Sequence, residues 1–182
     1  MRADTERLHL REFDASDAEL TNQYESNPEV VRYQTHPPRS LAESLEYIKL
    51  SMATAQESPR RTFDLAVVLR EEARLIGRCG LQVRNPEERE GTLWYVLHPA
   101  YWGRGIIPEA SRALLTFGFG ELGLHRVFVD CEPGNVASAR VAEKLGMRRE
   151  AHFRENAWVK GAWTDSVIYA ILEREWMTGQ GR

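Results

Sequence analysis

A glycine-rich segment at residues 101–109 has the residue types that a phosphate-binding loop needs. Its sequence is Tyr-Trp-Gly-Arg-Gly-Ile-Ile-Pro-Glu, and it precedes a run that predicts a helix. Gly103 and Gly105 allow backbone conformations that other residues avoid, so the chain can approach a ligand closely. Pro108 suits the first helical position. The helix N-terminus would offer free amides and partial positive charge to a pyrophosphate, with Arg104 as an added cation. A plain strand-to-helix turn is an equally weighted alternative.

A second segment, residues 135–147, combines helix-capping residues with a serine that is placed for chemistry. Asn135 is a good N-cap residue, and Gly146 suits a left-handed C-cap. Ser138 follows Asn135 by three residues, so both face the first turn of the predicted helix, beside the end of a strand. A well-capped amphipathic helix accounts for most of these residues, with a buried stripe expected at Ala137, Val141 and Leu145.

Hydrophobic spacing and turn residues predict the elements that position these segments. Ser40 and Glu43 have the spacing of a capping box, which predicts a helix that ends before Pro59. The expected strands are 6–13, 62–70, 74–84, 91–97, 125–131, 153–159 and 164–173, and the other expected helices are 14–24, 108–122 and 135–145. We therefore expect an α/β (α+β) fold with a mixed, mostly antiparallel central sheet of about seven strands, flanked by helices. The chemistry should lie where an antiparallel first half meets a strand–helix–strand–helix second half.

The composition indicates one reduced globular domain. The 182 residues are 42% hydrophobic and 28% charged, and no repeat or linker divides them, so we expect a single domain over residues 1–182. A net charge of −3 disfavours a nucleic-acid partner. Cys79 and Cys131 lie far apart and the five histidines are scattered, so neither a disulfide nor a metal site is expected. The lack of a signal-peptide pattern and of an apolar stretch near ~20 residues predicts a cytoplasmic protein with no membrane partner.

The order of the two segments is specific. A strand, a WGxG loop, a helix, a second strand and then NxxSxxxxEKxG together resemble the GNAT superfamily of acetyl-CoA-dependent N-acetyltransferases. Within it, the chain looks most like the Rim-type branch, which acetylates the N-termini of ribosomal proteins. The resemblance extends from Leu8 to Trp176 and includes the Glu109-Ala110 pair. It implies one N-acetyltransferase domain with a core at residues 8–176.

This resemblance implies a coenzyme site between the two halves of the sheet. In the family, the strand at 91–97 splays from the strand at 125–131, and the pantetheine of acetyl-CoA lies in the gap. Backbone groups of Tyr95 and Leu97 would bind the acetyl and pantetheine portion, and the amides of residues 103–107 would hold the pyrophosphate. The expected coenzyme-binding residues are Tyr95, Leu97, Trp102, Gly103, Arg104, Gly105, Ile106, Ile107, Asn135 and Ser138.

The same resemblance suggests roles in catalysis. Ser138 would lie near the thioester sulfur and protonate the leaving thiolate, and Asn135 would contact pantetheine. The candidates for the general base are Asp130, Glu155 and an ordered water. Relatives usually carry glycine or alanine where Ile107 stands, so the isoleucine side chain is expected to narrow the approach to the phosphates.

The acceptor is expected to be a primary amine. An α-amine has an ordinary pKa of ~8 and a lysine of ~10.4, so holding a lysine neutral near pH 7 costs roughly 3 kcal/mol more. A chain without a strong base therefore favours a protein or peptide N-terminal α-amine that attacks directly in a ternary complex. A small amine is the alternative acceptor. Ala142 and Ala157 stand where some relatives carry a catalytic tyrosine and glutamate, which leaves a non-catalytic acyl-CoA-binding module open. A homodimer is one alternative for the oligomeric state.

Overall fold

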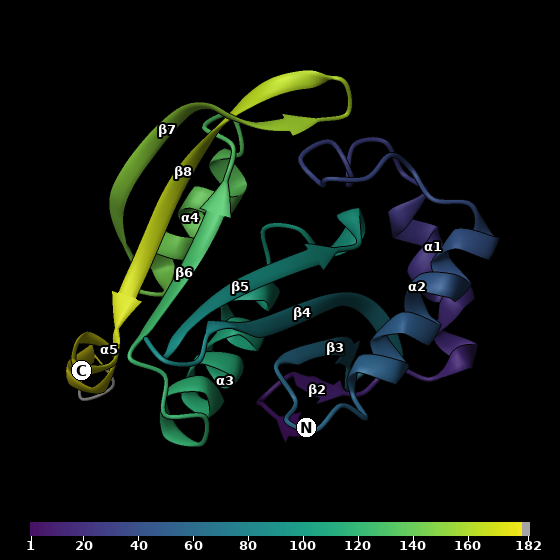
Figure 1. Ribbon diagram of the computed structural model, residues 1–182. Helices are drawn as coiled ribbons and strands as arrows, with labels where there is room; N and C mark the ends of the chain where they lie inside the picture. Colours follow the sequence, from purple (N-terminus) through teal and green to yellow (C-terminus); the bar gives the residue numbers. More distant parts are fainter. Residues whose placement is uncertain (180–182) are drawn as a thin grey trace.

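The chain forms one open sheet with helices on both faces (Figure 1). The computed structural model describes residues 1–179. The eight strands are in the order β1-β2-β3-β4-β5-β6-β8-β7. They are β1 (Ala3–Asp4), β2 (Leu8–Arg11), β3 (Thr62–Leu69), β4 (Arg74–Asn85), β5 (Glu90–Leu97), β6 (Arg126–Cys131), β7 (Arg148–Val159) and β8 (Ala162–Leu172). The helices are α1 (Ala18–Glu25), α2 (Leu41–Thr54), α3 (Ile106–Gly120), α4 (Val136–Lys144) and α5 (Glu173–Gly179). This confirms the mixed, mostly antiparallel sheet that the sequence predicts.

Helices α1 and α2 cover one face of the first half of the sheet. The side chain of Ser40 accepts a hydrogen bond from the Glu43 amide, and the Glu43 carboxylate accepts one from the Ser40 amide. The predicted capping box is therefore present, and α2 begins where the sequence placed it. Tyr24 of α1 and Ile48 of α2 are fully buried in the core beneath these helices. Burial of such a side chain stabilises the fold by about 1.5–3 kcal/mol relative to exposure.

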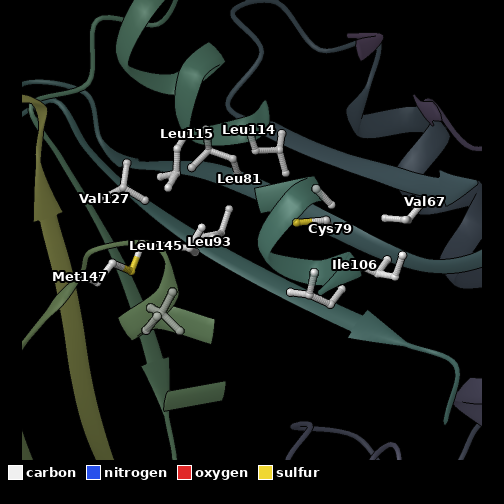
Figure 2. Packing of buried hydrophobic residues seen from close by; sticks show 14 of the residues in the cluster. Val67, Cys79, Leu81, Leu93, Ile106, Leu114, Leu115, Val127, Leu145 and Met147 are labelled. Carbon is white, nitrogen blue, oxygen red and sulfur yellow. The ribbon is translucent and has the colours of Figure 1, made fainter. Parts of the chain in front are cut away.

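Helices α3 and α4 cover the opposite face, above the larger core (Figure 2). Leu114 and Leu115 of α3 are fully buried with Leu81 of β4, and Leu93 of β5 lies in the same cluster. This core also reaches Leu145, which follows α4. The alternation of side chains along each strand therefore separates two faces, one under α1 and α2 and the other under α3 and α4.

Strands β5 and β6 are paired only where they begin. They are parallel, and their register joins Glu90, Gly91 and Thr92 to the first half of β6. Beyond Thr92 the two strands diverge (Figure 1), and β6 continues its pairing with β8 on its other side. The splay expected between the strands at 91–97 and 125–131 is therefore present. Among residues 1–179, one edge of β5 has no strand partner after Thr92.

Several elements differ from the sequence predictions. Helix α3 starts at Ile106, so Pro108 is the third helical residue and not the first, because Gly105 takes a left-handed conformation (φ 75°) and serves as the N-cap. In α4 the buried side chains are Ser138 and Ala142, whereas Ala137 is exposed. Strand β1 and helix α5 were not predicted. Among residues 1–179, no helix is long and apolar enough to cross a membrane.

Candidate functional site

A pocket of about 510 Å³ opens at the place where β5 and β6 diverge. Its walls come from β3, β4, β5, β6, α2, the start of α4 and the segment that joins α1 to α2. The lining residues are Tyr33, Gln34, Thr35, His36, Arg39, Tyr47, Leu50, Ser51, Thr54, Thr62, Asp64, Arg78, Gln82, Leu93, Trp94, Tyr95, Val129, Asp130, Cys131, Asn135 and Ser138. Of the residues predicted from the sequence, Tyr95, Asp130, Asn135 and Ser138 meet here.

This pocket has walls from both faces of the sheet. Leu93 of β5 and Val129 of β6 belong to the core under α3 and α4, so Trp94 and Asp130, which are next to them in sequence, lie on the opposite face. All four residues line the pocket. The pocket therefore connects the two faces through the gap in the sheet. Two reactants could enter from opposite faces and meet between β5 and β6.

On the α4 side of the gap, Ser138 is held by hydrogen bonds to the Asn135 side chain and to the Tyr95 hydroxyl, which also donates to the Ser138 carbonyl (3.2 Å). Its amide donates to the Asn135 side-chain oxygen (3.1 Å), as an N-cap predicts. Its hydroxyl lies 2.7 Å from the hydroxyl of Tyr95, which reaches it from β5. Burial raises the pKa of Tyr95 well above its ordinary value, even though the hydrogen bond to Ser138 lowers it, so the phenol keeps its proton. The pair can therefore deliver a proton to an atom in the gap.

The glycine loop has the geometry of an anion site. Gly103 and Gly105 both have φ of 75°, and a side chain on Gly103 would meet nothing within 4 Å. Within residues 1–179, the backbone amides from Gly103 to Ile107 have no hydrogen-bond acceptor. Five consecutive unpaired N–H groups at the start of α3 suit a phosphate ligand. The coenzyme-binding role of the loop, with which this geometry is compatible, stays a prediction.

Arg7 ties this loop to the N-terminal strand. Its guanidinium donates to the Arg104 carbonyl (2.9 Å) and to the Glu109 carboxylate (2.7 Å). The Glu109 carboxylate also accepts from the Thr5 hydroxyl. Burial alone would raise the pKa of Glu109, but the hydrogen bonds from Thr5 and Arg7 lower it. Glu109 therefore stays ionised and anchors the first turn of α3 to the edge of the sheet.

Two of the expected coenzyme-binding residues, Leu97 and Ile107, make contacts within the protein. The Leu97 carbonyl accepts a hydrogen bond from the indole N–H of Trp102 (2.8 Å), so one of its two lone pairs is occupied. Ile107 is 6% exposed and its side chain lies in the larger core. The expectation that this side chain narrows the approach to the phosphates is therefore wrong. The isoleucine anchors the helix and leaves only its backbone at the loop.

The structure separates the two carboxylates predicted as general bases. Asp130 is exposed on β6 and lines the pocket on the face opposite Ser138. Glu155 does not line the pocket; it lies in an irregular part of β7 with φ of 48°, and its amide donates to Asp165 (2.8 Å). Of the two predicted bases, the geometry thus places Asp130, and not Glu155, at the pocket.

A buried charged network on the α1 and α2 side was not predicted. The fully buried Glu25 carboxylate accepts hydrogen bonds from Arg78 (2.8 Å) and Arg39 (2.8 Å), and His36 Nε2 lies 3.2 Å away. Burial would raise the pKa of Glu25, but His36 and the two arginines lower it to about 2. Asp64 lies beside Arg78 and accepts from Ser51 (2.9 Å). The sequence signal that could have indicated this network is a charged residue within each of two otherwise apolar strands, Asp64 in β3 and Arg78 in β4.

This arrangement provides what a group transfer between two ligands requires. One face offers unpaired backbone amides for a polyanion and a hydroxyl pair for proton delivery. The opposite face offers a carboxylate and a polar, charged wall. Among the described residues, no group of three or more His, Cys, Asp or Glu side chains is placed to hold a metal ion.

The sequence and fold match known acetyltransferases. Residues 7–148 match the family described as "Acetyltransferase (GNAT) domain". The N-acetyltransferase YnaD of Bacillus subtilis (strain 168) is 33% identical over 176 residues, which are 97% of this chain and 99% of YnaD. A solved GNAT-family acetyltransferase from Bacillus anthracis shares 30% identity with a TM-score of 0.85 and covers 96% of this chain and 99% of its own. The ribosomal-protein-S5-alanine acetyltransferase of Vibrio fischeri shares the fold at 23% identity, with a TM-score of 0.80 and coverage of 97% and 98%.

Proposed function

The chain belongs to the GNAT acetyltransferase family and is an acetyl-CoA-dependent N-acetyltransferase; from this premise we propose that its acceptor is the α-amine of a peptide or protein N-terminus. The observation that carries the proposal is the pocket through the sheet, which has Ser138 on one face and Asp130 on the other. Coenzyme and acceptor would enter from opposite faces and react directly in a ternary complex.

We assign coenzyme binding to the glycine loop and the unpaired edge of β5. The amides from Gly103 to Ile107 would bind the pyrophosphate, because they have no acceptor among the described residues. The edge of β5 beyond Thr92 would bind the pantetheine, since no strand of the described chain pairs with its backbone groups there. Asn135, which also lines the pocket, would contact the pantetheine as well.

The transfer step would use groups from both faces. The neutral amine attacks the thioester carbonyl carbon, so a C–N bond forms; the nitrogen then releases one proton to water as the C–S bond breaks. Ser138 gives its proton to the departing thiolate, and Tyr95 can return one to Ser138 through their 2.7 Å contact. The proton of the incoming ammonium passes to Asp130 or to a water beside it. Near neutral pH, less free energy is needed to deprotonate an α-amine (ordinary pKa ~8) than a lysine (~10.4), which favours an α-amine acceptor.

A small amine acceptor and a non-catalytic acyl-CoA-binding module are the competing functions. Acetyl-CoA at 100 times its Kd should stabilise either an enzyme or a binding module by about 2.7 kcal/mol in a thermal-shift measurement. Release of the coenzyme thiol should then be measured with N-terminal peptides beside amino acids and polyamines. We expect the peptides to be acetylated with the highest kcat/KM. Stabilisation without thiol release from any amine would identify a binding module, and a polyamine preference would identify a small-amine enzyme.

A further inference from the structure

Arg78 is a buried charged residue of the pocket that has no role in the transfer step proposed above. It is only 5% exposed, yet it lines the pocket on the same face as Asp130. Its Nε donates to Glu25 (2.8 Å), and its guanidinium lies 4.8 Å from the centre of the Tyr47 ring. Within the described part of the chain, neither of its terminal nitrogens has a hydrogen-bond acceptor. The nearby Asp64 oxygen is 4.0 Å from Nη1, which is too long for a hydrogen bond.

Arg39 has a similar arrangement. Its Nη1 donates to the other oxygen of Glu25 (2.8 Å), its guanidinium lies 4.2 Å from the centre of the Tyr47 ring, and it too lines the pocket. One buried carboxylate thus holds two guanidinium groups in fixed positions. A rigid fork of this kind loses little freedom when it binds a ligand.

The charges of this network select the kind of group that would bind. Two positive charges, on Arg78 and Arg39, are balanced by two negative charges, on Glu25 and Asp64. A full anion has no net opposite charge to meet, and an ammonium group cannot accept from the unpaired N–H groups. A neutral oxygen acceptor fits both conditions, because it satisfies buried donors without adding charge.

We propose that Arg78, with Arg39 beside it, binds the carbonyl oxygen next to the reacting amine of the acceptor, and so selects aminoacyl and peptide α-amines over amines that lack this carbonyl. The proposal rests on the acceptor site described above. It makes Arg78 a specificity-determining residue on the acceptor side and gives it no part in coenzyme binding.

The test compares alaninamide with isopropylamine, which has the same three-carbon skeleton but carries a methyl group in place of the carboxamide. For Arg78→Lys we expect kcat/KM to fall about tenfold or more with alaninamide and to stay within about twofold with isopropylamine. The two amines differ in pKa, but this difference cancels when the ratio of their kcat/KM values is compared between variant and wild type. Arg39→Lys should change the same ratio in the same direction.

The controls separate folding, coenzyme binding and acceptor binding. Arg74→Lys changes an arginine on the same strand that does not line the pocket, and it should leave the ratio unchanged. The Kd for acetyl-CoA and the melting temperature identify a variant that is merely damaged. If Arg78→Lys and Arg39→Lys both lower kcat/KM equally for the two amines, or lower it for neither, the inference is wrong. The proposed function would still stand in that case. Wild-type protein that acetylates neither amine nor any peptide would overturn the proposed function and this inference with it.

Discussion

At the scale of single residues, we propose that two side chains on opposite faces of the sheet divide the chemistry. Ser138 and Asp130 belong to consecutive elements, but the gap between β5 and β6 lets both line one pocket. The proposal gives each of them a role in proton transfer. The two roles predict different consequences of substitution.

Ser138→Ala should lower kcat much more than it weakens coenzyme binding. General acid catalysis contributes typically 10²–10⁴-fold, and Tyr95 would supply part of it across the gap in the absence of the serine, so we expect a loss of about 10–100-fold in kcat. Calorimetry should give a Kd for acetyl-CoA within about threefold of wild type. Ser26→Ala, at an exposed serine outside the pocket, is the control. An unchanged kcat would exclude the proton-donor role of Ser138.

Asp130→Asn should reduce activity, whereas Glu155→Gln should not. Only the first of these carboxylates lines the pocket. The loss for Asp130→Asn should be greatest at low pH, where more of the acceptor is protonated, and should diminish as pH approaches the acceptor pKa of ~8. The measurement is kcat/KM from pH 6 to about 9 for both variants. A larger loss for Glu155→Gln would reverse the assignment of the base.

At the scale of elements, the N-terminal segment around β2 supports the glycine loop. Arg7 joins the residues before β2 to the Arg104 carbonyl and to the first turn of α3. This contact spans almost a hundred residues of sequence and fixes the loop that carries the unpaired amides. The position of the loop therefore depends on an element that does not itself touch the pocket through the sheet.

Arg7→Met should weaken acetyl-CoA binding with little effect on stability. Exposed ion pairs contribute about 0–1 kcal/mol to folding, and the Arg7 side chain is 42% exposed. Loss of a fixed loop should raise the Kd for acetyl-CoA about three- to tenfold, as measured by calorimetry. Lys49→Met removes another exposed ion pair, far from the loop in sequence, and serves as the control. Equal Kd values for Arg7→Met and wild type would show that the loop is fixed without Arg7.

Local signals in the sequence predicted most helices and strands. Features that depend on contacts between distant residues could not be predicted from it. The Ser40 capping box and the Asn135 N-cap depend on neighbours three residues away, and both predictions are confirmed. The contact between Tyr95 and Ser138 joins residues 43 positions apart, and that between Glu25 and Arg78 joins residues 53 apart. No local pattern specifies such pairs. The start of α3 was misplaced because the left-handed Gly105 begins the helix before Pro108.

At the scale of the whole molecule, the buried charged network that we propose for acceptor binding also contributes to stability. Glu25 is fully buried between α1 and the sheet, and three basic side chains surround its carboxylate. Such a carboxylate must stay ionised for the network to hold. The stability of the fold is therefore expected to depend on acidity.

Stability should fall as the pH drops from about 4.5 towards 2. The pKa of Glu25 in the folded chain is about 2, against an ordinary value of 4.5, so its contribution is complete above 4.5 and is lost as the pH approaches 2. This difference corresponds to about 3 kcal/mol. Urea unfolding should show that the free energy of unfolding falls less over this pH range in Glu25→Gln than in wild type. Glu87→Gln, at an exposed glutamate, is the control and should behave as wild type. An identical pH dependence in Glu25→Gln and wild type would contradict this role.

The most direct test of the account is the binding of a bisubstrate ligand, in which the sulfur of coenzyme A is joined through an acetyl group to the amine of a peptide. If the two substrates meet through the gap between β5 and β6, calorimetry should give a Kd at least about a hundredfold lower than that of coenzyme A or the peptide alone. Asp130→Asn and Arg78→Lys should each raise the Kd of this ligand and leave the Kd of coenzyme A unchanged. A bisubstrate ligand that binds no more tightly than coenzyme A would contradict a ternary complex through the sheet.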